Sequence, residues 1–566
     1  MRTRRWHANA VVDFRSTTTL WSILVLLAPA AAFVRALLAG WEPEGDDATI
    51  VLRARETLFG QVPLQGMRST AGGPDPALAN HHLGPMELHL LLPGSIIGSG
   101  WAVALTCTVI AGTCAIASLR WAHRFGGDPA VVVFGAGLIV VEWSVGATGL
   151  FRPFNPYVGL IPIFLALVLL TAHLFKCSGV WWPLILTTGL IAQANLAYAP
   201  IGLGLLGCSL LISIGRFFQG RPLKQARHDL SWSPRRLIRS VQRRQILRRG
   251  VPREFPRARA MITTATALVV WAPVLAEPLR HSPGNITQLA KAATTDSDSQ
   301  GLLWALSRLG LAAPVPSGFR PLGPDLVYAP SALGQGVAVI LLLALAVAAL
   351  PWKIVNHRGV AMLPARAALV GLALTVATFG TLPTQGLANH YLASILPVAV
   401  FAWCAIAWRG FLARPRLRRR FRERRTVQYA GFGAVAAVLL LFVAAPPDFT
   451  GPRLGGQASD LLLARTADLP RGSSVQISGT GFLANLSTTP AVALALERSG
   501  LRAHYLTPWP YTEDAERLSR SSTPADALEI HLVGNDAADR SAPPDTEFVG
   551  TIREGRDYQI DIYASK

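Results

Sequence analysis

The chain has 566 residues, of which 51% are hydrophobic and only 15% are charged, and its mean hydropathy is +0.36. Soluble globular proteins usually carry about a quarter charged residues, so this composition excludes an ordinary soluble enzyme. The net charge of +20 sits in short basic blocks between apolar runs, which excludes the continuous basic face of a nucleic-acid-binding protein.

Apolar stretches recur along the chain at a length that suits a membrane. About 20 apolar residues in a helix span a hydrocarbon core about 30 Å thick. We therefore expect a polytopic α-helical membrane protein, with a transmembrane domain over residues 1–445 and a second domain over residues 446–566. The sequence predicts eleven spans, at residues 19–39, 99–119, 129–150, 155–175, 179–196, 199–215, 260–279, 334–352, 362–382, 391–408 and 428–445.

Basic residues mark one side of the transmembrane domain. Residues 216–260 hold fourteen Lys or Arg, residues 409–427 form a second basic block, and the N-terminal MRTRRW adds a third. All three blocks fall on one side if eleven spans follow a cytoplasmic N-terminus, in agreement with the positive-inside rule. We expect a multi-pass plasma-membrane protein in contact with membrane lipids, with the loops at 40–98 and 280–333 and the C-terminal domain outside the cytoplasm.

The first outer loop begins with GWEPEGDDATIVLRARE, which places four acids within six positions, including the adjacent pair Asp46 and Asp47. A carboxylate costs several kcal/mol inside a bilayer, so these acids must lie beyond the membrane or face a water-filled cavity. The following residues place Ala48, Val51 and Leu52 on one helical face, which predicts a helix lying in the membrane interface. Asp46 or Asp47 would cap the amide groups of that helix.

Further polar side chains gather in the outer loops and at the predicted outer ends of the spans. They are Arg68, His81 and His82 in the first loop, Glu142 in the third span, Gln193, Asn195 and Tyr198 at the end of the fifth span, Arg280 and His281 in the 280–333 loop, and His390 and Tyr391 at the mouth of the tenth span. An acid within a span is a functional candidate by default, although an ion pair of Glu142 with Arg35 or Arg152 is an alternative. The other groups fit either a polar ligand site or interfacial side chains and partners of a tight turn.

The C-terminal segment reverses the sign of the charge and shows strand patterns. Residues 446–566 hold sixteen Asp or Glu against eleven Lys or Arg. SVQISG, LEIHLVG, TEFVGTI and YQIDIY alternate as strands do, and TPAVALALERSG has helical spacing that stops at a glycine. We expect a small α/β domain outside the membrane.

The order of several short motifs resembles that of integral-membrane glycosyltransferases of the GT-C superfamily, and more narrowly of its actinobacterial members. GDDA follows the first span, then come PLQG, RSTAGG and HHLGP, and later QANLAYAP and EPLRHSPGNITQL. The likeness covers residues 1 to about 445. Two positions depart from the family pattern: Asn195 stands where His is frequent, and His81-His82-Leu83 replaces His-Pro.

The resemblance implies a GT-C-like fold and transfer of a sugar, such as an arabinofuranosyl or mannosyl group, from a polyprenyl-phosphate donor to a cell-envelope glycan, lipid or protein acceptor. It implies that Asp46 is the general base and that Asp47 is the second choice, or orients Asp46 or a divalent cation. The polar residues named above would then bind the sugar or the donor phosphate. The sequence contains no cofactor-binding motif, and whether a divalent cation binds stays open. No nucleic-acid partner is expected.

Other functions stay open on the sequence alone. A transporter or flippase of lipid-linked saccharides would need polar groups through the bilayer midplane and usually internal repeats, whereas the polar groups here gather at one face. A non-catalytic envelope scaffold would not explain the acidic residues of the first loop or Glu142. A ligase or polymerase acting on lipid-linked glycans would use the long loop at 280–333.

Overall fold

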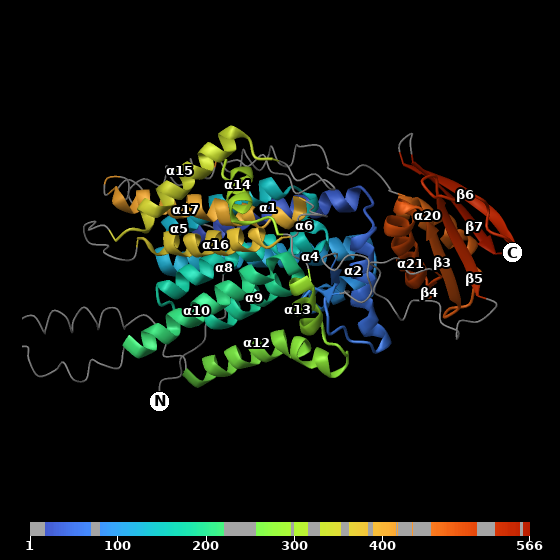
Figure 1. Cartoon of the computed structure of the whole chain (residues 1–566), viewed down its shortest axis with the longest axis horizontal. Coiled ribbons are helices and arrows are strands. Elements are labelled where there is room, and N and C mark those ends of the chain that lie inside the picture. Colours follow the sequence, from blue (N-terminus) through green and yellow to red (C-terminus); the bar gives the residue numbers. More distant parts are fainter. Residues whose placement is uncertain are drawn as a thin grey trace, which may run out of the picture.

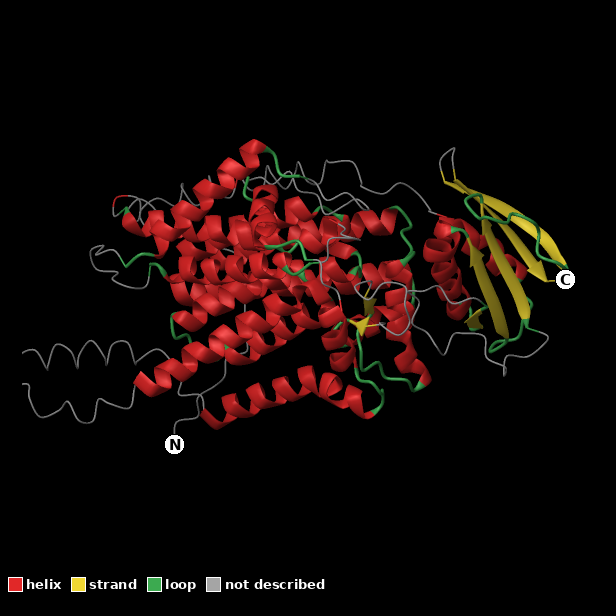
Figure 2. Ribbon diagram, viewed as in Figure 1, coloured by secondary structure: helices red, strands yellow, loops and turns green. Residues whose placement is uncertain are grey.

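The computed structural model describes residues 17–69, 80–219, 256–295, 299–314, 329–351, 361–382, 389–414, 416, 433, 454–506, 527–554 and 558–565. Helices make up most of this part of the chain, and a strand-rich unit lies at one end of the long axis (Figure 1, Figure 2). The chain is thus a polytopic α-helical membrane protein that carries a C-terminal α/β domain.

Nine segments of the described residues are helical, long and apolar enough to cross a membrane. They are built from α1 (Thr17–Leu38), α4 (Gly100–Gly126), α5 (Asp128–Val145), α7 (Asn155–Val158) with α8 (Leu160–Leu174), η4 (Leu196–Tyr198) with α10 (Ala199–Gln219), α12 (Pro256–Ala276) with η6 (Glu277–Leu279), α15 (Ala332–Ala349), α16 (Leu363–Gly380), and η7 (Asn389–Leu392) with α17 (Ile395–Ala413).

Three expected spans differ from the structure or fall outside it. The fifth is α9 (Trp181–Ala194), a helix of only 14 residues that packs against α8, α10 and α12. The third ends early at Val145, and a separate turn of helix, α6 (Thr148–Phe151), follows it. The span predicted at 428–445 and most of the basic blocks at 216–260 and 409–427 lie outside the described residues.

Helix α8 forms the centre of the bundle. Its sequence, LIPIFLALVLLTAHL, is apolar on every face, and almost all of its residues are buried. A helix that is hydrophobic all round is stable only where neighbours surround it. Contacts with α4, α9, α10, α16 and α17 supply those neighbours.

The described parts of the segments at 40–98 and 280–333 fold into short elements rather than plain connections. They contain α2 (Asp46–Arg55), η1 (Glu56–Phe59), the antiparallel pair β1 (Arg68–Ser69) and β2 (Asn80–His81), α3 (Met86–Ile97), α13 (Asn285–Thr295) and α14 (Leu302–Ala312). Helix α14 packs against α15, α16 and α17, so part of the 280–333 segment belongs to the helical bundle. Asp46, Asp47, Arg68 and His81 are therefore held on ordered elements.

The C-terminal domain is a five-stranded sheet with helices on the side that faces the bundle (Figure 1). The strand order is β4-β3-β5-β7-β6, in which β3 pairs in parallel with β4 and β5, and β7 pairs antiparallel with β5 and β6. All four predicted strands and the predicted helix are present, whereas β4 was not predicted. Its elements are α20 (Leu454–Arg465), β3 (Ser474–Thr480), η8 (Ala484–Thr488), α21 (Thr489–Arg498), β4 (Arg502–Tyr505), β5 (Leu528–Gly534), β6 (Thr546–Glu554) and β7 (Tyr558–Ser565).

Helix α2 forms where it was predicted, but two expectations about it are wrong. It lies between α3 and α21, so its apolar residues contact protein on two sides rather than resting one face in the interface. Its N-cap is Gly45, and no side chain caps it, because Asp46 and Asp47 are already inside the first turn. Both carboxylates are consequently available for contacts beyond their own helix.

Candidate active site

Asp46 and Asp47 point into different surroundings because successive residues of a helix project about 100° apart. Asp46 is exposed, and it makes no hydrogen bond or ion pair within the described residues. Asp47 is 1% exposed. The tandem acids are therefore two different groups, one accessible and one enclosed.

The enclosed carboxylate is bound by Arg152, which follows α6. The Arg152 Nε atom donates to Asp47 Oδ2 at 2.6 Å, and the two side chains are 22% and 2% exposed. The contact joins the segment at 40–98 to the connection between α6 and α7. Neither carboxylate oxygen of Glu142 has a hydrogen-bond partner among the described residues, so Arg152 does not pair with Glu142.

The surroundings of Asp46 change its acidity. The carboxyl group reaches the surface, yet dense packing around it removes part of its hydration and raises its pKa above the usual aspartate value. The neighbouring charge of Asp47 raises the pKa further, and Arg152 partly opposes the shift. An accessible carboxylate with a raised pKa is suited to accept a proton near neutral pH.

A third carboxyl group, Glu87 on α3, completes this region. It is 3% exposed, and its Oε1 atom has no hydrogen-bond partner among the described residues. Burial raises the pKa of Glu87 well above its usual value, and the charge of Asp47 adds to the shift. We call Asp46, Asp47, Glu87 and Arg152 the α2 centre.

Aromatic rings connect the α2 centre to η7, at the start of the last described span. The Arg152 guanidinium lies 5.6 Å from the centroid of the Phe154 ring, which meets the rings of Tyr157 and His390 edge-on at 5.0 and 5.1 Å. Tyr391 lies next to His390, with ring centroids 4.4 Å apart. The predicted residues His390 and Tyr391 thus belong to the same region as Asp47.

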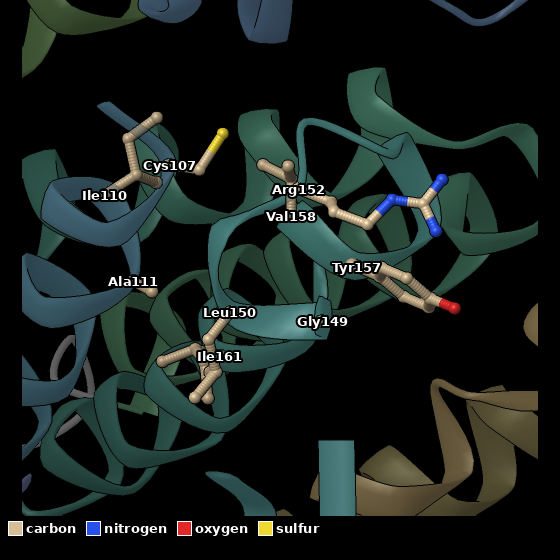
Figure 3. Close-up of a pocket in the computed structure, with 9 residues that line it drawn as sticks. All are labelled: Cys107, Ile110, Ala111, Gly149, Leu150, Arg152, Tyr157, Val158 and Ile161. Atoms are coloured by element: carbon tan, nitrogen blue, oxygen red, sulfur yellow. The ribbon is translucent and has the colours of Figure 1, made fainter. Parts of the chain in front are cut away.

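A small cavity opens beside Arg152. It is lined by residues of α4, α6, α7 and α8 together with the α6–α7 connection, and at about 10 Å³ it is near the minimum that one water molecule needs. Figure 3 shows the Arg152 guanidinium and the Tyr157 hydroxyl extending toward the same side of this cavity. The side chains that line it on α4 are Cys107, Ile110 and Ala111.

A second set of polar groups surrounds the β1–β2 pair. The amide of Asn285 accepts from His81 N and donates to the His81 and His82 carbonyl oxygens. The Glu277 carboxylate accepts from Gln65 Nε2 at 2.6 Å and from Asn285 N. We call Gln65, His81, His82, Glu277 and Asn285 the ribbon cluster.

The two predicted histidines in the ribbon cluster do not carry positive charge at neutral pH. Burial lowers the pKa of His82 to about 4 and that of His81 to about 3, and the charges of Arg53 and Arg68 lower the pKa of His81 further. His82 Nδ1 accepts from Leu196 N, so its ring proton sits on Nε2. Positive charge near this cluster comes from the two arginines instead.

Gln193, Asn195 and Tyr198 connect elements to one another. Gln193 accepts from Met86 N and donates to the Val270 carbonyl oxygen, and Asn195 Oδ1 accepts from Ala197 N within its own turn. The buried Tyr198 hydroxyl donates to the His390 carbonyl oxygen at 3.0 Å. Only the Asn195 bond lies within the turn, Gln193 and Tyr198 bond to other elements, and sugar binding by these residues remains a prediction.

The remaining candidates lie apart from one another. Glu142 is fully buried in α5, and neither carboxylate oxygen has a hydrogen-bond partner within the described residues. Arg280 is exposed, and His281 Nδ1 lies 3.4 Å from Glu277 Oε1 at the edge of the ribbon cluster. Neither Glu142 nor Arg280 has a recorded contact with the α2 centre.

The α2 centre does not fit a divalent cation. Within the part of the chain that the structure describes, no group of three or more His, Cys, Asp or Glu side chains could hold a metal ion. The guanidinium of Arg152 already neutralises Asp47, and it would repel a cation placed there. No step of the chemistry is assigned to a metal.

Sequence reasoning missed Arg152 and Glu87 as site residues. In the sequence, Arg152 is only an alternative partner of Glu142, and Glu87 is not among the candidates. The only available signal was the charge of each residue beside a predicted span, and that signal does not identify a partner.

Comparisons with known proteins give one structural likeness. The chain is similar to the crystal structure of ArnT from Cupriavidus metallidurans in the apo state, with 14% sequence identity and a TM-score of 0.45, over 96% of this chain and 97% of that one. No family model matches the chain, and no curated protein matches it.

Proposed function

We propose that this chain is a membrane glycosyltransferase of the GT-C type, which moves a sugar from a polyprenyl-phosphate donor to a cell-envelope glycan, lipid or protein on the outer face of the membrane. The observation that carries the proposal is the α2 centre. It combines an accessible carboxylate of raised pKa with a buried carboxylate–guanidinium pair, outside the spanning helices. The N-terminus would be cytoplasmic and the C-terminal domain extracytoplasmic.

The reaction needs one base and a stabilised leaving group. The acceptor hydroxyl oxygen attacks the anomeric carbon of the donor while its proton passes to the Asp46 carboxylate. The bond between that carbon and the phosphate oxygen breaks, and polyprenyl phosphate leaves with the electron pair. Base catalysis of this kind contributes about 10²–10⁴-fold to a rate.

The neighbours of Asp46 have separate roles in this proposal. Asp47, fixed by Arg152, keeps a negative charge beside Asp46 and so keeps its pKa high enough to accept the proton. Only the Nε edge of Arg152 is used by Asp47, and the other guanidinium N–H groups can donate to the departing phosphate. Arg53 and Arg68 lie near His81, and of the two Arg53 is paired with Glu56 at 2.7 Å.

The test uses purified protein in lipid nanodiscs, several lipid-phosphate sugars including arabinofuranosyl and mannosyl donors, and mass spectrometry of the acceptor. Asp46→Asn should reduce transfer by about 10²–10⁴-fold, because it removes the proton acceptor and keeps the shape. Asp128→Asn is the matched control, since this acid lies at the opposite end of α5, beside His123.

Asp128→Asn should retain transfer within about twofold of the unaltered protein, because a surface acid far from the chemistry contributes little to it. Full turnover by Asp46→Asn would remove Asp46 from the mechanism. Movement of the lipid-linked sugar across the bilayer without any new glycosidic bond would replace the glycosyltransferase proposal with transport.

A further inference from the structure

The C-terminal domain contacts the residues that lead directly into α2. Gly45 adopts a positive φ of 55°, a conformation that favours glycine, and its N–H donates to the Ser487 carbonyl oxygen in η8 at 3.1 Å. Glu44 Oε1 accepts from Gly456 N in α20 at 3.4 Å. The residue before Asp46 is thus bonded to a domain that begins about 400 positions later in the chain.

Glu42 joins three parts of the protein. Its Oε2 atom accepts from Arg498 Nη1 of α21 at 2.7 Å and from Gly100 N, the first residue of α4, at 3.1 Å. The C-terminal domain, the first outer loop and a membrane span therefore meet at one carboxylate. The Arg498 side chain packs closely on Gly98, because a Cβ added at Gly98 would lie only 2.8 Å from it.

Arg55 makes a second connection at the other end of α2. Its side chain is buried, donates to the Ser95 and Ile96 carbonyl oxygens at the end of α3, and lies 3.7 Å from Glu497 of α21. An arginine in the last turn of a surface helix would ordinarily reach into water. Here it connects α2 to α3 and α21.

One hydrophobic core includes both sides of this contact. Apolar residues of α2 such as Val51 and Leu52 belong to the same buried cluster as Leu88 of α3 and Val492 and Leu496 of the C-terminal domain. Figure 1 shows α20 and α21 on the bundle side of the sheet, at the end where α2 lies. Helix α2 is packed between the two domains and is held from both.

From these contacts we infer that the C-terminal domain positions the catalytic loop: Arg498 and Glu497 act through Glu42 and Arg55 to fix α2, and through α2 the orientation of Asp46. This inference deepens the proposed function and rests on it for the role of Asp46. The docking itself rests only on the contacts described. Arg498 and Glu497 are positioning residues, because neither touches Asp46.

The first test compares two arginines of the C-terminal domain in the full chain. Arg498→Met removes the contact with Glu42, whereas Arg465→Met removes an ion pair of similar kind, to Glu547 at 2.9 Å, that lies wholly within the C-terminal domain. Hydrogen exchange of the α2 amides should become at least about tenfold faster in Arg498→Met and stay unchanged in Arg465→Met. Arg498→Lys should restore most of the protection.

The second test measures the kinetics of sugar transfer. A misplaced catalytic group loses rate more than substrate affinity, so Arg498→Met should lower kcat by about tenfold with the KM for the lipid donor within about twofold. It should also displace the acid limb of the pH profile, because the packing around Asp46 sets its pKa. Arg465→Met should change neither.

The outcomes separate the two proposals. Equal α2 exchange and equal kcat in Arg498→Met and Arg465→Met would overturn the positioning role. Faster α2 exchange in Arg498→Met, together with no sugar transfer by the unaltered protein, would support the docking and reject the glycosyltransferase function. The double variant Glu42→Gln/Arg498→Met should lower kcat and α2 protection no more than the more damaging single variant does, because both substitutions remove the same contact.

Discussion

The α2 centre and the ribbon cluster lie at the same end of the bundle and contain similar side chains, yet they use them differently. In the ribbon cluster, Asn285 and Glu277 make a closed set of hydrogen bonds with their neighbours. In the α2 centre, Asp46 makes none within the described residues, and Glu87 keeps an unmatched oxygen. Buried polar groups are normally hydrogen-bonded, so the unmatched oxygen of buried Glu87 points to a functional role, while the exposed Asp46 carboxylate is accessible to a ligand.

The largest difference between the two regions should appear when Arg152 is removed. Arg152→Gln leaves the buried Asp47 carboxylate without its cation, which should lower the free energy of unfolding by about 3–5 kcal/mol. Thermal unfolding in detergent measures this loss of stability, with Arg124→Gln as the control because Arg124 is exposed and its guanidinium lies over the ring of Trp121 rather than beside a buried carboxylate. Arg152→Gln should also move the acid limb of kcat/KM to higher pH, because Arg152 lowers the pKa of Asp46. A variant as stable as the Arg124 control would mean that the pair is not needed.

Removing Asn285 should affect stability alone. Asn285→Ala removes the acceptor of the His81 N–H and a donor to the His81 carbonyl oxygen, at a cost of about 1–3 kcal/mol, whereas the His82 carbonyl oxygen still accepts from Gly66 N. The pH dependence of kcat/KM should keep its shape, because the base is elsewhere. An altered acid limb in Asn285→Ala would mean that the ribbon cluster takes part in catalysis and is not only stabilising.

Replacing Asp47 should shift the pH dependence in the direction opposite to that of Arg152→Gln. Asp47→Asn removes a negative charge that raises the pKa of Asp46 and frees Arg152, which lowers it. The acid limb of kcat/KM should therefore move to lower pH, as pH–rate profiles of the purified variant would reveal. Shifts of the same sign in both variants would contradict the assigned roles.

The smallest expected effect is a gain in stability from Asp46→Asn. The folded-state pKa of Asp46 is raised, so the favourable contribution of its neutral form is complete below the ordinary value of 3.8 and is lost as the pH rises through the folded-state value. At neutral pH the asparagine variant should thus melt slightly higher than the unaltered protein, and below about pH 4 the two should coincide. Scanning calorimetry at both pH values checks this, and a lower melting temperature at neutral pH would refute it.

Much of the fold could be predicted because its signals are long and repetitive. Hydropathy averaged over about 20 residues places spans such as α1 and α16 within a few positions, and strict alternation identifies β5 and β7. The strand β4, with the sequence RAHY, also alternates between accessible and buried residues, but four residues are too few for the alternation to be recognised in the sequence. Helix α9 is shorter than its apolar run because its last polar residues form a turn.

The site could be predicted only in part, since its contacts join distant residues. The tandem aspartates stand out in the sequence, but what distinguishes Asp47 from Asp46 is an arginine 105 positions away. The predicted interfacial helix carries apolar residues that suit a membrane surface and a protein neighbour equally well, so the docking of α21 could not be foreseen. The local sequence around Arg152 or α21 does not show that either contacts α2.

The shared core of α2 and the C-terminal domain also sets an order of assembly. Asp46 leaves the ribosome about 400 residues before Leu454, which at about 5–20 residues per second is a delay on the order of tens of seconds. During that interval Val51 and Leu52 have α3 beside them but lack their C-terminal neighbours. In a nascent chain halted before Leu454, α2 would therefore lack the C-terminal part of the core that packs around it. The packing around Asp46 is complete only after the C-terminal domain has been translated.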